Sequence, residues 1–166
     1  FCTLGGLPML HLPAATVLAD AETNLRAGQP NLSLLSEDLL RYGAEGVNCR
    51  PEAALGMLRQ LRALAGVRLL QADHTNIASV AQYDDAHLQE LHYLLGAGAQ
   101  RYPWLNLGVE TASGELLVRL GGRPKMKGAN PDTWGDFCRE QLNRLMRAGF
   151  VPMVSLVLGS AAETEA

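Results

Sequence analysis

Four short, nearly continuous apolar runs divide this 166-residue chain into alternating strand-like and helix-like stretches. The first three runs begin roughly 36 or 37 residues apart, which leaves room for one helix between parallel strands, and the last gap is longer. Because apolar strands of this kind are usually covered on both sides, we expect helices on both faces of the sheet. The sequence therefore predicts a single α/β domain whose strands lie at 31–35, 67–72, 104–109 and 150–158.

The stretches between these runs carry signals for helices. Proline is tolerated in the first turn of a helix because its missing N–H has no partner there, and it stands at three expected starts: Pro13, Pro51 and Pro131. Asn130 is the expected N-cap of the last helix, and Asp84 and Asp85 open another. Apolar residues recur at helical spacing in these two helices and are predicted to face the core: Leu88, Leu91, Leu95, Trp134, Cys138 and Leu145.

Charge and composition argue against several classes of protein. A net charge of −3 provides no basic field for nucleic acid or for an anionic membrane. The apolar runs are far shorter than the roughly 20 residues that cross a bilayer. Three widely spaced cysteines, Cys2, Cys49 and Cys138, do not form a disulfide framework, and the last two are expected to be inert. We therefore expect a cytoplasmic protein with neither nucleic acid nor membrane as a partner.

Each apolar run is followed by polar residues that a core would not accommodate. The carboxyl ends of parallel strands meet at one edge of a sheet or one rim of a barrel, so these residues are predicted to converge on a common pocket. The four groups are Ser36-Glu37-Asp38, Asp73-His74-Thr75-Asn76, Glu110-Thr111-Ala112-Ser113, and Gly159 with Glu163-Thr164.

Structural roles for the same residues remain open at this point. Ser36 or Asp38 would serve equally well as the cap of a following helix. Ser113, with Glu110 and Glu115, would suit a helix N-terminus in the same way. His74 alone is more often a hydrogen-bonded structural histidine than a ligand. The sequence contains no phosphate-binding loop, serine-hydrolase elbow or zinc-protease motif. It therefore gives no motif support for a phosphate-binding protein, a serine hydrolase or a zinc protease.

Several short motifs along the chain resemble those of the radical S-adenosylmethionine (radical SAM) superfamily, in particular proteins that often carry a cobalamin-binding domain. Phe1-Cys2 resembles the end of the cysteine motif, and the block 36–44 (SEDLLRYGA) resembles "AEDVLRYGA". The order and spacing of the remaining matches follow the family from one end to the other: 27–29 (AGQ), 74–80 (HTNIASV), 108–113 (GVETAS), 122–125 (GRPK), 131–134 (PDTW) and 158–165 (LGSAAETE).

The resemblance implies part of a (β/α)6 TIM-like partial barrel. Residues 1–166 would be a radical SAM core domain truncated at both ends, without the first strand, most of the cluster loop and the last unit. The family holds a 4Fe-4S cluster with three thiolates and cleaves S-adenosylmethionine to a 5′-deoxyadenosyl radical. The resemblance also implies an electron donor such as flavodoxin or ferredoxin, and cobalamin bound by a domain not present here. The chain alone is expected to be inactive, and its substrate is not identified.

Residue by residue, the resemblance implies that Cys2 is a cluster ligand and that Asp73 and His74 lie on the substrate side. Residues near the strand ends would bind the cofactor: Phe1, Ser36, Glu37, Asp38, Glu110, Thr111, Ser113, Gly159 and Glu163. No residue is assigned as catalytic. The loop after Gly159 departs from the family, because Ala161 and Ala162 replace a proline and a glycine.

Two further functions remain open. A metal-dependent TIM-barrel hydrolase or aldolase would use Asp73, His74, Glu37 and Glu110 as ligands or as acid and base. A non-catalytic, degenerate barrel module retained for protein contacts would account for the altered Ala161-Ala162 loop.

Overall fold

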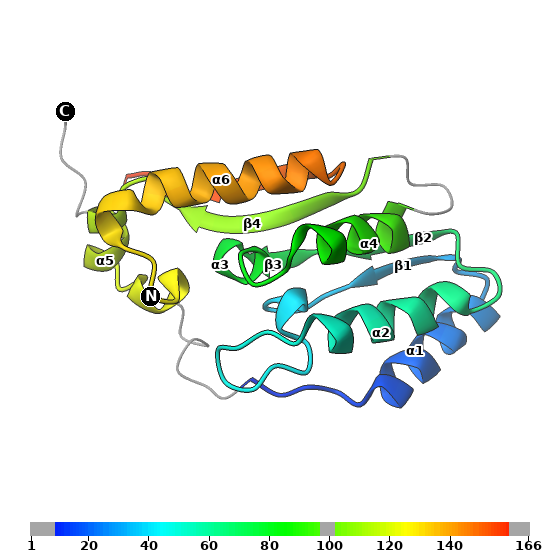
Figure 1. Cartoon of the computed structure of the whole chain (residues 1–166). Coiled ribbons are helices and arrows are strands. Elements are labelled where there is room, and N and C mark those ends of the chain that lie inside the picture. The colour runs from blue at the N-terminus through cyan, green and yellow to red at the C-terminus, as the bar shows by residue number, and fades with distance from the viewer. Residues whose placement is uncertain (1–8, 97–101, 160–166) are drawn as a thin grey trace.

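The computed structural model describes residues 9–96 and 102–159 of the chain, in which helices and parallel strands alternate as predicted (Figure 1). Phe1, Cys2 and Glu163 lie outside these residues. Short 3-10 helices occur at Leu39–Arg41 (η2), Arg123–Met126 (η3) and Pro131–Thr133 (η4). The α-helices are Ala14–Arg26 (α1), Pro51–Ala63 (α2), Ile77–Val80 (α3), Asp85–Gly96 (α4), Gly114–Arg119 (α5) and Trp134–Arg147 (α6), and the strands are Asn31–Leu34 (β1), Leu69–Ala72 (β2), His74–Asn76 (β3), Trp104–Glu110 (β4) and Val151–Leu156 (β5).

The strands form two small parallel sheets that follow one another along the chain. Strand β1 pairs with β2, with Leu32 opposite Leu70. Strand β4 lies between β3 and β5, with Leu107 opposite both Thr75 and Val154. Only Asp73 separates β2 from β3, so β3 continues the path of β2. The spatial order is therefore β1, then β2 and β3 together, then β4, then β5. This order of parallel strands confirms the α/β prediction, and the described residues do not form a closed barrel.

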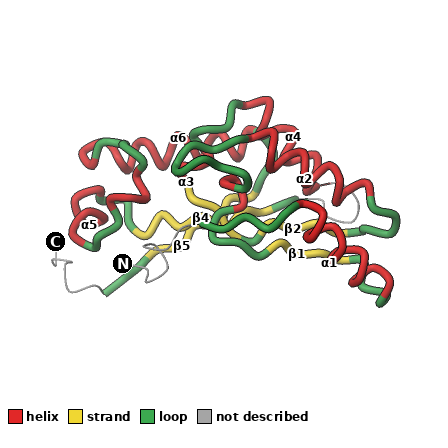
Figure 2. Tube along the Cα trace, turned by 90° about the horizontal axis from the view of Figure 1, so that it is seen from below, coloured by secondary structure: helices red, strands yellow, loops and turns green. Residues whose placement is uncertain are grey.

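Helices α2, α3, α4 and α6 lie on one side of the strands (Figure 2). Side chains that point to these helices are fully or nearly buried, among them Leu70, Leu105 and Leu107. Strand residues between them are polar, as at Ser33 and Asn106, and less buried. The predicted covering of both faces is therefore not observed in the part of the chain that the structure describes. Within the apolar runs, more buried and less buried residues alternate. This period of two is typical of a sheet with one buried face.

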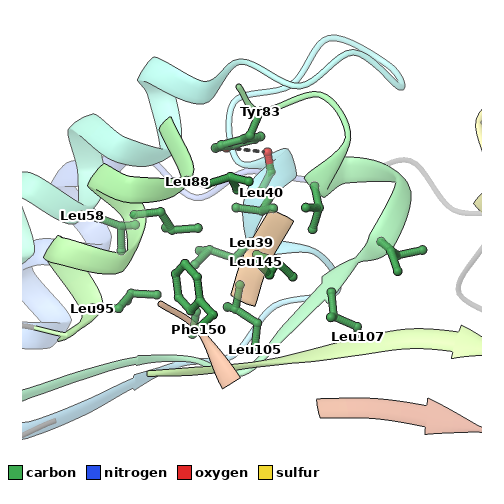
Figure 3. Packing of buried hydrophobic residues seen from close by; sticks show 14 of the residues in the cluster. Leu39, Leu40, Leu58, Tyr83, Leu88, Leu95, Leu105, Leu107, Leu145 and Phe150 are labelled. Carbon is green, nitrogen blue, oxygen red and sulfur yellow. Dashed lines mark hydrogen bonds between the residues drawn. The ribbon is translucent and has the colours of Figure 1, made fainter. Parts of the chain in front are cut away.

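The core lies between the sheets and these helices (Figure 3). The predicted stripes of α4 and α6 are confirmed as buried: Leu88, Leu91, Leu95, Trp134, Cys138 and Leu145. The Tyr83 hydroxyl donates a hydrogen bond of 2.9 Å to the carbonyl of Leu40, which satisfies the polar end of a ring that is 1% exposed. The core thus joins residues from every part of the described chain.

The helix starts agree with the proline signals to within a few residues. Pro51 opens α2, whereas Pro13 is the residue before α1. Pro131 opens η4, and the Asn130 side chain accepts a hydrogen bond of 3.0 Å from the Asp132 N–H, as its predicted N-cap role requires. Within residues 9–96 and 102–159, no helix has the length and apolarity to cross a membrane.

Candidate functional site

Because all the strands run in one direction, their carboxyl ends lie toward the same side of the molecule, where α5 is found (Figure 1). Glu37 follows β1, Glu110 ends β4 and Gly159 follows β5. Ser36 and Glu37 are exposed. The parallel topology therefore brings three of the predicted cofactor positions to one edge, which is where parallel α/β proteins generally bind their ligands.

An ion pair between Glu110 and Lys125 marks the end of β4. Both side chains are largely withdrawn from solvent, with 12% of Glu110 and 26% of Lys125 exposed. Glu110 has a φ of +68°, a conformation that costs a non-glycine residue about 1–3 kcal/mol, and the strand pairing is irregular at this point. The surrounding structure thus holds a strained backbone that directs this carboxylate toward Lys125.

Gly108 has no side chain, and the ion pair of Glu110 and Lys125 occupies the space where a side chain would lie. A Cβ atom at this position would lie 2.7 Å from Lys125 Nζ and 2.8 Å from Glu110 Oε1. The same Cβ would lie 3.6 Å from Cε1 of His74. His74, Glu110 and Lys125 therefore gather over one glycine, although they come from three different segments of the chain.

Asp73 and Asn106 extend this group along the strands. The Asn106 side-chain amide donates a hydrogen bond of 3.3 Å to Asp73 Oδ1, and Asn106 lies opposite His74 in the sheet. We call the five side chains the polar cluster: Asp73, His74, Asn106, Glu110 and Lys125. It combines two carboxylates, an imidazole, an amide and an amine, which can donate and accept hydrogen bonds to a small polar ligand.

Asp38 lies elsewhere, with 6% of the residue exposed. Its two oxygens accept hydrogen bonds of 2.6 Å from the Thr75 and Ser79 hydroxyls. Its side chain does not cap η2. Asp38 is thus a buried acceptor that joins β3 and α3 to the loop after β1.

Thr111 and Ser113 order the loop after Glu110. Ser113 caps α5 by accepting a hydrogen bond of 3.2 Å from the Leu116 N–H, which is the structural alternative left open by the sequence. Thr111 Oγ1 accepts a hydrogen bond of 3.1 Å from the Ser113 N–H, and its carbonyl accepts one of 2.8 Å from the indole of Trp134. These contacts hold the loop beside the polar cluster.

Sequence reasoning did not select Asn106 or Lys125 as site residues. Asn106 lies within an apolar run. A polar residue at such a position, on the uncovered face of the sheet, could have indicated a functional role. Lys125 lies in the 122–125 motif, and the whole chain has only two lysines, Lys125 and Lys127. The small number of lysines could have drawn attention to Lys125. Its partner Glu110 is fifteen residues away in the sequence, however, and is brought to it by the turn through α5 and η3.

The described thiols are poor candidates for metal ligands. Burial raises the pKa of Cys138 to about 12 and also raises the pKa of Cys49, and metals bind the thiolate form. Cys138 lies in the core on α6, whereas Cys49 lies in the loop before α2. No set of three His, Cys, Asp or Glu side chains is placed to hold a metal ion within the described residues.

No family model matches this chain, and no curated protein is similar to it.

Proposed function

We propose that this chain is part of a radical SAM core domain, a partial (β/α)6 barrel, and that S-adenosylmethionine lies across the carboxyl ends of β1, β4 and β5. The observation that carries the proposal is the ion pair of Glu110 and Lys125 over Gly108, at the end of a central parallel strand. The motif order in the sequence and the parallel topology support it.

The polar cluster suits the methionyl part of this cofactor, which carries an ammonium and a carboxylate on one carbon atom. Glu110 can accept hydrogen bonds from the ammonium, and Lys125 can donate to the carboxylate. Charge-assisted contacts of this kind are about twice as strong as neutral ones. At the neighbouring strand, Gly159 has a φ of +75° and lacks a side chain, so backbone can approach a flat adenine closely.

A 4Fe-4S cluster does not fit the thiols that the structure describes. Such a cluster requires several thiolates around one point, whereas Cys49 and Cys138 lie on separate elements with raised pKa values. Cys2 remains the one cysteine that the resemblance assigns to the cluster. The proposed function is therefore the binding of S-adenosylmethionine. Cobalamin and the flavodoxin or ferredoxin donor remain predictions of the resemblance.

Replacing Glu110 with glutamine is expected to weaken S-adenosylmethionine binding by about 10- to 100-fold. A hydrogen bond to a charged group contributes about 1.5–3 kcal/mol, and each 1.4 kcal/mol is a factor of ten in affinity. Titration calorimetry on the chain and on the E110Q variant measures the change. The control is Glu115→Gln, which removes an exposed carboxylate paired with Arg119 on α5 and should leave the affinity unchanged.

A second ligand separates recognition from loss of structure. 5′-Methylthioadenosine has the adenosyl and sulfur parts but neither the ammonium nor the carboxylate, so its affinity should be equal for the wild type and E110Q. Equal weakening of both ligands would contradict the assigned role of Glu110. If the unaltered chain binds neither ligand, the proposal fails and a non-catalytic module becomes the better explanation.

A further inference from the structure

Lys127, the second lysine of the chain, lies in surroundings unlike those of Lys125. Its Nζ donates hydrogen bonds of 3.0 Å to the Val47 carbonyl and 3.0 Å to Ser79 Oγ, and it lies 3.8 Å from Cys49 Sγ. Two of these acceptors are a carbonyl and a hydroxyl, and the third is a thiol whose pKa is raised by burial. Among the described residues, no carboxylate lies within ion-pair distance of Lys127, whereas Lys125 is paired with Glu110.

Asp38 is linked to Lys127 through the Ser79 hydroxyl, and its charge also acts on the amine. Ser79 donates its proton to Asp38 Oδ2 at 2.6 Å and can therefore only accept from Lys127. Ser79 is 0% exposed, so it is not accessible as a nucleophile, whereas Lys127 is only partly buried. Of these two residues, only Lys127 lines a pocket.

The charged and buried surroundings also affect the protonation of this amine. Burial lowers the pKa of Lys127, and the positive charge of Arg41 acts in the same direction. Cys49 and Asp38 act in the opposite direction but do not cancel the effect of burial. A larger fraction of Lys127 is therefore neutral near pH 7 than of an exposed lysine, and only the neutral form is nucleophilic.

Lys127 also lines a pocket of about 510 Å³ that is open to solvent. The pocket is also lined by the apolar residues Met126, Phe137 and Ala78 and by the polar residues Gln82 and Asn130. The pocket lies between α3, the loop before α2 and the turn that leads into α6. It contains none of the polar cluster.

We propose that Lys127 is a nucleophilic amine that forms an imine with a small aldehyde or ketone bound in this pocket. The ammonium first releases a proton to solvent, and the nitrogen lone pair attacks the carbonyl carbon. A C–N bond forms, the two protons left on the nitrogen pass through solvent to the former carbonyl oxygen, the C–O bond breaks as this oxygen leaves as water, and a C=N bond remains. No oxidant or reductant takes part. This site is independent of the proposed binding of S-adenosylmethionine.

Reductive trapping tests the proposal. The chain is incubated at pH 7 with benzaldehyde and sodium cyanoborohydride, and the benzyl group is located by peptide mass spectrometry, which also separates it from the α-amino group of Phe1. We expect most of the lysine label on Lys127 and little on Lys125, whose ammonium is held by Glu110. Lys127→Arg should remove nearly all of it, whereas Lys125→Arg should leave the labelling of Lys127 unchanged. Equal labelling of both lysines would overturn the proposal.

The pH dependence gives a second readout. Labelling of Lys127 should rise with pH and reach half its maximum at a lower pH than labelling of Nα-acetyllysine under the same conditions. A midpoint equal to or above that of the reference amine would contradict the proposal, because the amine would then have no enhanced nucleophilicity.

A variant at the pocket rim separates pocket binding from simple exposure. Ala81 lines the pocket and is exposed, so Ala81→Trp should narrow the pocket without disturbing the core. Benzaldehyde labelling of Lys127 should fall severalfold in this variant, while labelling by formaldehyde, which is much smaller, should be retained. If benzaldehyde labelling is unchanged, the pocket does not bind the carbonyl compound and the proposal is wrong.

Discussion

Replacing Trp134 with alanine is expected to lower the free energy of unfolding by about 3–5 kcal/mol, the usual cost of removing a large buried aromatic side chain. Trp134 is 1% exposed and stacks on Phe137 with ring centroids 5.5 Å apart. Its indole also donates the hydrogen bond to Thr111 that holds the loop beside Glu110. Urea denaturation followed by circular dichroism measures the loss.

Trp134→Phe separates the two contributions. Phenylalanine keeps most of the buried apolar area but leaves the Thr111 carbonyl without its donor, so we expect a smaller loss of about 1–3 kcal/mol. The other tryptophan of the chain, Trp104 on β4, then reports unfolding by fluorescence. A loss below about 1 kcal/mol for Trp134→Ala would show that α6 does not pack as described.

Replacing Asp38 with alanine is expected to cost about 2–5 kcal/mol of folding stability. The Thr75 and Ser79 hydroxyls would both lose their acceptor, and a buried unsatisfied group costs about 1–3 kcal/mol. The control places Asp38→Ala in a Thr75→Val, Ser79→Ala background, where no hydroxyl remains to be satisfied. There the same substitution should cost much less, because removal of both partners of a buried hydrogen bond is often nearly neutral.

Ligand binding by the Asp38 variants distinguishes a structural role from a cofactor role. If Asp38 is the buried acceptor described above, folded Asp38→Asn protein should bind S-adenosylmethionine as the unaltered chain does. An affinity loss in this variant as large as that of Glu110→Gln would instead support the sequence-based prediction that Asp38 contacts the cofactor. Denaturation curves for each variant ensure that only folded protein is compared.

The sequence alone was sufficient to locate the main helices and four of the five described strands, but not β3, which lies in a predicted polar segment. The runs at 31–35 and 104–109 coincide closely with β1 and β4, and the stripe of Leu88, Leu91 and Leu95 is buried as predicted. Burial imposes a local period of two on strands and of about 3.6 on helices, so these features can be read from the order of the residues. The parallel direction followed from the length of chain between successive strands.

Only the tertiary structure decided the partners of the polar residues. Asp38 and Glu37 are adjacent in the sequence, yet one is buried beneath hydroxyls and the other is exposed. Lys125 and Lys127 are two residues apart, yet one is paired with a carboxylate and the other lines a pocket. The periodic pattern of a sequence reports which apolar residues are buried. The burial and the hydrogen-bond partner of a polar residue depend instead on which distant segments the packed core brings together, and this is not encoded in any local period.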